Sequence, residues 1–142
     1  MVNGVPQVRA MFKRKGAAVV AAAKAVTQRE GEKVASAMRY LAPVQRAPGG
    51  GDLRRSIRVE DAPTINTGRG GERGFIGVKV KAGDSTTVVT NSSGGRFQNA
   101  RIQEFGTKNM PANPYFFAAW RPMRSSVRGS ITRAVRRAWV SG

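Results

Sequence analysis

The chain has 142 residues and a formal net charge of +17, with 25 Lys and Arg against 8 Asp and Glu. It contains no Cys and no His, which excludes disulfides, thiolate chemistry, the commonest general base and the commonest zinc ligand. Such a basic balance points to a polyanionic partner or an acidic protein surface, without defining a fold. The length suits a single domain, which we expect to span residues 1–142.

The sequence carries no signal for a membrane or for secretion. No run approaches about eighteen consecutive apolar residues, so we expect no membrane span. The first residues lack a charged segment followed by an apolar one, so we expect no signal peptide.

Residues 7–41 are predicted to form a long helix. Apolar residues fall mostly on one helical stripe, and Pro43 ends the pattern. The other face is basic, and its ordinary interpretation is a solvated surface. The sharper interpretation is a face that lies against nucleic acid or an acidic neighbour. The basic residues of this face are Lys13, Arg14, Lys24, Arg29, Lys33 and Arg39.

The middle of the chain reads as short strands separated by polar, glycine-rich loops. Alternating or β-branched apolar residues predict strands at 53–60, 75–81, 86–90 and 100–105. Glycine and proline predict flexible loops near 45–52, 62–74 and 91–99.

Residues 114–139 return to helical spacing, with large apolar residues recurring every three or four positions. Pro122 is expected to kink or split this helix. The predicted fold class is therefore α+β, with a long N-terminal helix packed on a small, mostly antiparallel sheet of about four strands, plus a C-terminal helix.

Basic residues dominate the C-terminal part of the chain, because no acidic residue follows Glu104. This is the most nucleic-acid-like feature of the sequence, and it equally suits a helix that docks on an acidic partner. The candidate contact residues for DNA or an acidic partner are Arg124, Arg128, Arg133, Arg136, Arg137, Lys13 and Arg14.

The stretch 102–117 combines a predicted strand end, a glycine turn, two prolines and an aromatic run. Gly106 permits a backbone angle that other residues resist, and Pro114 suits the first turn of a helix. The ordinary interpretation is a strand-to-helix corner that anchors a core.

No set of residues fills the roles of an enzyme. The acidic residues show no spacing typical of a metal site or a carboxylate pair, and the only adjacent two, Glu60 and Asp61, lie at a strand end where neighbouring side chains diverge. We therefore expect no catalytic activity, no cofactor and no metal.

Two segments together resemble a family of neck or tail-completion proteins of tailed DNA phages, the family named after the tenth gene product of a lambdoid coliphage. The first segment is Leu-Ala-Pro-Val at 41–44 followed by Leu-Arg-Arg-Ser-Ile at 53–57. The second is Glu-Phe-Gly-Thr at 104–107 followed by Met-Pro-Ala-Asn-Pro-Tyr at 110–115. One departure is visible at residues 45–50, where the family has a short Asp-Thr-Gly turn. The family-motif residues, taken as structural, are Leu53, Ser56, Ile57, Glu104, Phe105, Gly106, Thr107, Pro111, Pro114 and Phe116.

The resemblance implies a structural virion protein, assembled in the host cytoplasm, that acts at the head–tail junction of a long-tailed phage or phage-like particle. It implies a ring of identical subunits, a hexamer, as neck, tail-completion or tail-terminator tier. The implied partners are the head connector or stopper, the tail tube or terminator proteins, and genomic double-stranded DNA in the lumen.

A free basic protein that binds nucleic acid without sequence preference is the alternative. It predicts a monomer or dimer that binds DNA or RNA tightly, with a steep dependence on salt. The stretch 104–117 favours the phage interpretation, because a simple basic binder has no need for such a corner.

Overall fold

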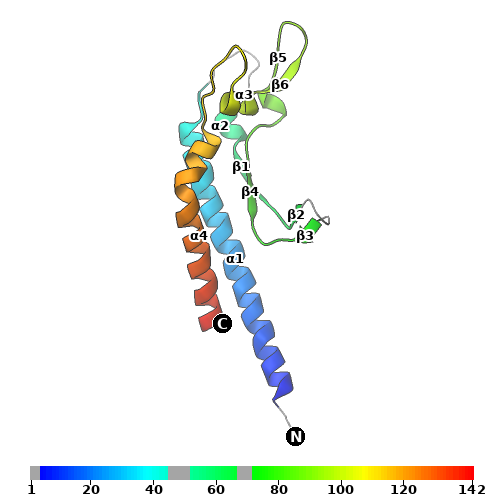
Figure 1. The fold of residues 1–142 in the computed structure, drawn as a ribbon. Helices are drawn as coiled ribbons and strands as arrows, with labels where there is room; N and C mark the ends of the chain where they lie inside the picture. The colour runs from blue at the N-terminus through cyan, green and yellow to red at the C-terminus, as the bar shows by residue number, and fades with distance from the viewer. Residues whose placement is uncertain (1–3, 45–51, 67–71) are drawn as a thin grey trace. The chain divides into compact units, whose positions relative to one another are not determined.

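The computed structural model describes residues 4–44, 52–66 and 72–142. It confirms the α+β class, with a long helix near each end of the chain and short elements between them (Figure 1). The elements are α1 (Val5–Leu41), α2 (Leu53–Ser56), β1 (Arg58–Asp61), β2 (Thr64–Asn66), β3 (Glu72–Gly74), β4 (Val78–Lys81), the 3-10 helix η1 (Ser85–Thr87), β5 (Val88–Thr90), β6 (Arg96–Gln98), α3 (Asn99–Phe105) and α4 (Phe116–Ser141).

The described residues fall into two compact units, to which α1 and α4 both contribute. We call the first the helix-pair unit; it takes its residues from Met1–Glu30, Asp61–Val78 and Ser125–Gly142. We call the second the corner unit; it takes its residues from Gly31–Glu60 and Lys79–Arg124.

In the helix-pair unit, the first part of α1 and the last part of α4 run antiparallel, side by side (Figure 1). The rings of Phe12 and Trp139 lie 6.1 Å apart between their centroids. The Lys15 Nζ donates to the Trp139 carbonyl at 2.9 Å and lies 5.7 Å from the centre of its ring, a cation–π distance. The antiparallel β2–β3 ladder, with Thr64 opposite Gly74, belongs to the same unit.

In the corner unit, the short elements enclose an apolar core. β5 and β6 pair antiparallel, with Val88 opposite Gln98, and β1 pairs with β4. Gln98 then caps α3 by accepting the Ala100 N–H. The buried apolar residues of this unit are Val34, Ala35, Met38, Ala42, Leu53, Ile57, Ala100, Tyr115 and Ala119.

The two long helices confirm the predictions for 7–41 and 114–139 to within two residues at each end. Of the kink or split predicted at Pro122, the split is wrong, because α4 continues through this residue. A proline inside a helix removes one backbone hydrogen bond and crowds the preceding turn. The sustained apolar spacing on both sides of Pro122 keeps the remaining turns together.

The strand predicted at 100–105 is wrong, because these residues form α3. Ala100, Gln103 and Glu104 are buried, and they stand at positions i, i+3 and i+4, which share one face of a helix. A strand repeats its buried face every second residue and a helix about every 3.6 residues. Six residues around Ile102 are too few to tell these two periods apart. The predicted strand-to-helix corner is therefore a helix-to-helix corner between α3 and α4.

The other predicted strands are shorter than expected. The strand at 53–60 begins as α2, because the Asp52 Oδ1 accepts the backbone N–H groups of Arg54 and Arg55 and so caps a helical turn. The strands at 75–81 and 86–90 shrink to β4 and β5.

The predicted sheet of about four strands is instead a set of separate two-stranded sheets, β1–β4, β2–β3 and β5–β6. The sequence missed β2 and β3 inside the loop predicted at 62–74, and β6 inside the loop predicted at 91–99. Most of the loop predicted at 45–52 lies outside the described residues.

Candidate functional site

The carboxylate of Glu104 joins α3 to the start of α4. Its Oε2 accepts the backbone N–H groups of Tyr115 and Phe116, each at 2.9 Å, and its Oε1 accepts that of Phe117 at 3.0 Å. These are N–H groups at a helix N-terminus, which have no partner within the helix and attract negative charge. The first turn of α4 has no acidic residue of its own, so the 8 % exposed Glu104 supplies that charge from α3.

Gly106 makes the turn that brings the two helices together. Its φ of +71° and ψ of −177° belong to a region that residues with a Cβ avoid. A Cβ at this position would also lie 2.7 Å from the Ala112 nitrogen and 2.8 Å from the Met110 oxygen. The Asn113 N–H donates to the Gln103 carbonyl at 2.7 Å, which holds the returning chain against α3. The backbone freedom predicted for Gly106 is therefore confirmed.

Tyr115 is buried at the centre of the corner. Its side chain is 1 % exposed, and its hydroxyl donates to the Ala100 carbonyl at 3.3 Å. Burial, with a smaller contribution from the nearby charge of Glu104, raises the pKa of Tyr115 to about 12. Both effects disfavour the phenolate, so the phenol stays protonated across the neutral range.

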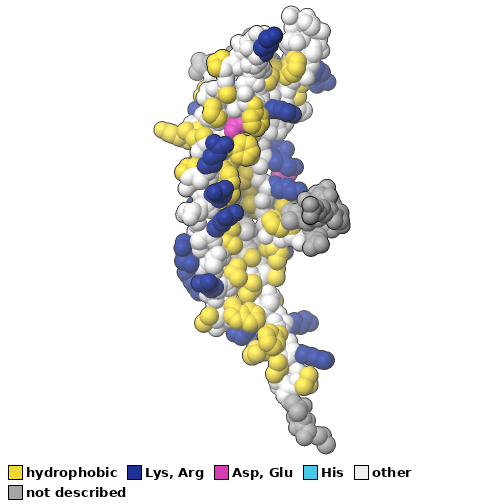
Figure 2. Space-filling model, viewed as in Figure 1, with side chains coloured by type: hydrophobic (Ala, Val, Ile, Leu, Met, Phe, Trp, Pro, Cys, Tyr) yellow, Lys and Arg dark blue, Asp and Glu magenta, His cyan; other side chains and the backbone are white. Residues whose placement is uncertain are grey.

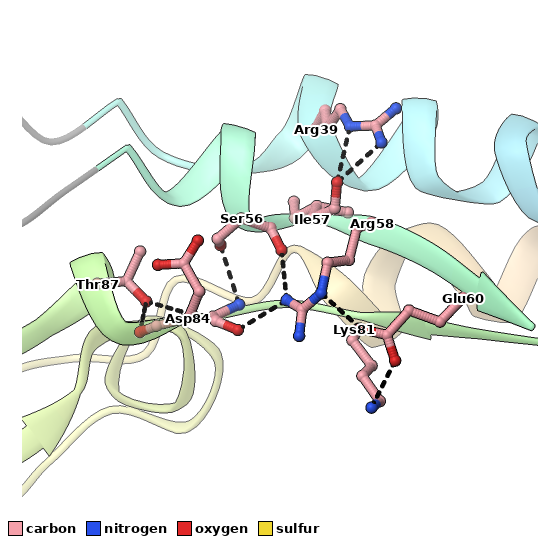
Figure 3. A network of polar contacts seen from close by, with 9 residues as sticks. Arg39, Ser56, Ile57, Arg58, Glu60, Lys81, Asp84 and Thr87 are labelled. Atoms are coloured by element: carbon pink, nitrogen blue, oxygen red, sulfur yellow. Dashed lines mark hydrogen bonds and ion pairs between the residues drawn. The ribbon is translucent and has the colours of Figure 1, made fainter.

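The motif residues 53–57 are also used inside the corner unit (Figure 3). The Ser56 Oγ donates to the Leu53 carbonyl at 2.7 Å and accepts the Gly83 N–H at 2.9 Å. The guanidinium of Arg39 donates to the Ile57 carbonyl through Nε at 3.1 Å and Nη2 at 2.8 Å. These contacts tie α1, α2 and the segment before η1 to one another.

Charged side chains extend this network along β1 and β4 (Figure 3). The Arg58 Nε lies 2.7 Å from the Glu60 Oε1, and the Lys81 Nζ lies 2.6 Å from the Glu60 Oε2. Hydrogen bonds from Lys81 and then Arg58 hold the pKa of Glu60 below its usual value. The Arg58 Nη1 also donates to the Ser56 and Gly83 carbonyls, so Arg58 and Lys81 are both engaged by internal partners.

The corner unit thus brings together the two motif segments that the sequence singled out. Leu53, Ser56, Ile57 and Glu104 are buried, and Phe116 is half-buried. The exposed motif residues are Phe105, Thr107, Pro111 and Pro114.

The candidate basic residues are all exposed, and the structure divides them between the two units. Arg124 belongs to the corner unit, whereas the other six belong to the helix-pair unit. Figure 2 shows Lys and Arg side chains recurring along α4. Arg133 is three and four residues from Arg136 and Arg137, so these like charges share one side of the helix.

Two cations missed by sequence reasoning contact or flank aromatic rings. Lys15 pairs with Trp139, at the opposite end of the chain, which no local pattern reveals. Arg101 is exposed on α3 and lines a pocket with Phe105 and Phe117. Its only sequence signal was its place three residues before Glu104.

Within the described ranges, no cluster of three or more His, Cys, Asp or Glu side chains has the arrangement of a metal site. Over the same residues, every helix is too short or too polar to cross a membrane. The polar side chains of the corner are used for internal hydrogen bonds, whereas cations and aromatic rings remain on the surface. The exposed cations and aromatic rings are therefore available to other macromolecules.

The chain belongs to the phage family described as "Bacteriophage HK97-gp10, putative tail-component", whose model matches residues 7–106. The resemblance read from the sequence is thereby confirmed, and the protein is a structural tail component of the virion. The match ends at Gly106, so it includes Glu104 and excludes α4 with its arginines. Neither a curated protein nor a solved structure gives a significant match.

Proposed function

We propose that this tail component forms a ring at the head–tail junction of a long-tailed phage or phage-like particle. In this role, identical copies join the head connector or stopper to the tail tube or terminator, and double-stranded DNA passes through the lumen. The observation that carries the proposal is membership of the tail-component family over residues 7–106.

The charge of the chain supports a location in the particle where the protein contacts polyanions. Copies of a +17 subunit repel one another unless acidic neighbours or DNA phosphates offset the charge. Rows of like charge on a helix, such as Arg133 with Arg136 and Arg137, cost about 0.2–0.5 kcal/mol for each pair. An anionic partner removes that cost, and phosphate contacts of this kind are independent of DNA sequence.

We assign the contact with DNA or an acidic ring to the exposed arginines of α4 rather than to the buried motif residues. Leu53, Ser56, Ile57 and Glu104 are buried and hold the fold, so they are not available to a partner. Arg128, Arg133, Arg136 and Arg137 are exposed and so are available to a partner. The arginines therefore face either the DNA in the lumen or an acidic ring of the neighbouring tier.

Electron microscopy of a lysate from which this gene has been deleted tests the proposal. Filled heads lying apart from complete tails are the expected result for a neck or tail-completion ring. Abnormally long tails are expected for a terminator, which is the tail-side form of the same junction role. Complementation with the wild-type gene is the control, and it should restore joined particles.

Normal, infectious, joined particles in the deletion lysate would contradict the proposal. They would favour a free basic protein that binds nucleic acid. Binding of the purified chain to duplex DNA should then be tight and steeply dependent on salt. The junction ring instead predicts weak binding by the free subunit.

A further inference from the structure

The surface beside the Glu104 corner carries a row of four aromatic rings that runs from the core to the solvent. Tyr115 is 1 % exposed, whereas Phe117 is 40 % and Phe105 is 64 % exposed. Ring centroids lie 6.3 Å apart for Tyr115 and Phe116, 5.3 Å for Phe116 and Phe117, and 6.4 Å for Phe117 and Phe105. Each ring therefore neighbours the next, and the outermost ring belongs to Phe105, the last residue of α3, directly before the Gly106 turn.

These rings line one side of a pocket of about 340 Å³ in the corner unit, at the low end of the range typical of ligand sites. Arg58, Lys81 and Arg101 lie on the same pocket. The first two are paired with Glu60 at 2.7 Å and 2.6 Å. For the exposed Arg101, the described residues provide no ion pair and no hydrogen bond. The pocket thus offers an open aromatic surface beside one uncompensated cation.

We propose that this pocket, which we call the Phe105 pocket, binds a short segment of a partner protein that presents an apolar side chain next to a carboxylate. The apolar side chain covers the rings of Phe105 and Phe117, and the carboxylate pairs with Arg101. Removing Phe105 from water is favourable in proportion to its exposed apolar area, and a carboxylate suits the fork of donors on a guanidinium.

The cations of the pocket favour a peptide over double-stranded DNA. Arg58 and Lys81 are already paired with Glu60, and the Glu104 carboxylate accepts three backbone N–H groups, so among the described residues that line the pocket Arg101 is the one cation left for an incoming anion. One free cation suits a single carboxylate, whereas a chain of phosphates is held by several. Double-stranded DNA also keeps its base faces stacked, so it presents nothing that covers an exposed phenylalanine ring.

Direct binding to peptides tests this proposal on the full-length chain. Two fluorescent peptide pools serve as probes, both with a central Phe, Trp or Leu; one pool has Asp or Glu on either side and the other has Asn or Gln. The acidic pool should bind saturably, and at least tenfold more tightly than the amide pool. Phe105→Ser and Arg101→Glu should each weaken the binding of the acidic pool at least tenfold.

Phe97→Ser is the matched control, because Phe97 is 46 % exposed on β6 but does not line the pocket. It should leave binding unchanged, and thermal unfolding of all three variants should show a folded chain. Equal binding of the two pools, or binding unaffected by Phe105→Ser, would overturn the proposal. So would a single-stranded oligonucleotide that binds in a Phe105- and Arg101-dependent manner while the acidic pool does not.

The inference rests on the proposed function only in taking the partner from the same particle. The two ideas fail in different experiments, since the peptide assay needs no virion and the deletion lysate needs no knowledge of the pocket. If no peptide binds but the deletion lysate contains separated heads and tails, the Phe105 pocket proposal fails and the junction ring proposal stands.

Discussion

The Glu104 corner and the C-terminal part of α4 are built on opposite principles. At the corner, one carboxylate accepts three backbone N–H groups and is almost fully buried. Along α4, Arg133, Arg136 and Arg137 are exposed, and within the described ranges the one hydrogen bond from their side chains runs from Arg133 Nη2 to the Ser130 Oγ at 3.3 Å. The difference shows that the buried motif residues maintain the fold, whereas the arginines outside the family match lie on the surface and make few internal contacts among the described residues.

The strongest test of this contrast is Glu104→Ala. It leaves three N–H groups at the start of α4 without their acceptor, and it should lower the free energy of unfolding by about 3 kcal/mol. Urea unfolding of the purified chain measures the effect. Glu32→Ala is the matched control, because it removes the same charge from an exposed residue whose ion pair with Arg39 spans 3.8 Å. The free energy of unfolding of that variant should fall by less than about 1 kcal/mol. Equal losses of stability in the two variants would contradict the assigned role of Glu104.

Gly106→Ala should have the next largest effect, about 2 kcal/mol, because it combines a positive φ with a close approach of the Ala112 and Met110 backbones. Gly94→Ala separates these causes. Gly94 also has a positive φ, of +81°, but a Cβ at that position would meet nothing within 4 Å. Gly94→Ala should therefore lower the free energy of unfolding by only about 1 kcal/mol. Urea unfolding compares the two variants, and a loss at Gly106 no larger than that at Gly94 would show that the close approach contributes nothing.

The buried phenol of Tyr115 gives a pH-dependent test of the corner. Its pKa rises from 10.0 to about 12 on folding, so the folded state binds the proton more tightly than the unfolded state. This contribution to stability is fully present below pH 10.0 and is lost as the pH rises towards about 12. Urea unfolding measured across this pH range should show that Tyr115→Phe no longer loses stability as the pH rises. Tyr40→Phe, which changes an 83 % exposed residue, should lose stability as the wild type does. The same loss in Tyr115→Phe as in the wild type would contradict the role assigned to the buried phenol.

The smallest effect is expected for the triple variant Arg133→Gln, Arg136→Gln and Arg137→Gln. Each exposed substitution should change the free energy of unfolding by less than about 0.5 kcal/mol, and relief of the like-charge row favours a slight gain. Urea unfolding of the variant measures it. A loss as large as that of Glu104→Ala would show that these arginines hold the fold, and the contrast between the two regions would fail.

The sequence predicted the helices well because their apolar spacing continues over many turns. Val26, Val34, Met38 and Ala35 are buried on α1, and α4 repeats the same period. It predicted the middle of the chain poorly, because these elements have only three to seven residues and their form is decided by side-chain caps. Asp52 turned a predicted strand into α2, and Gln98 opened α3.

At the site, the residue types were predictable and their roles were not. The motif marked Glu104 and Gly106, but only the fold shows that the Glu104 carboxylate meets N–H groups eleven to thirteen residues later. The exposure of the α4 arginines followed from their charge. The Phe105 pocket was hidden, because a phenylalanine at the end of a predicted half-buried strand is expected to face a core, whereas Phe105 ends α3 and is 64 % exposed.

Electron microscopy of deletion lysates complemented with α4 variants tests directly whether the α4 arginines act at the head–tail junction. One variant carries Glu at positions 133, 136 and 137, and its matched control carries Lys at the same positions. Joined particles are expected with the Lys variant, since the charge is kept, and filled heads separate from tails are expected with the Glu variant. Joined, infectious particles with the Glu variant at wild-type frequency would show that the α4 arginines do not act at the junction.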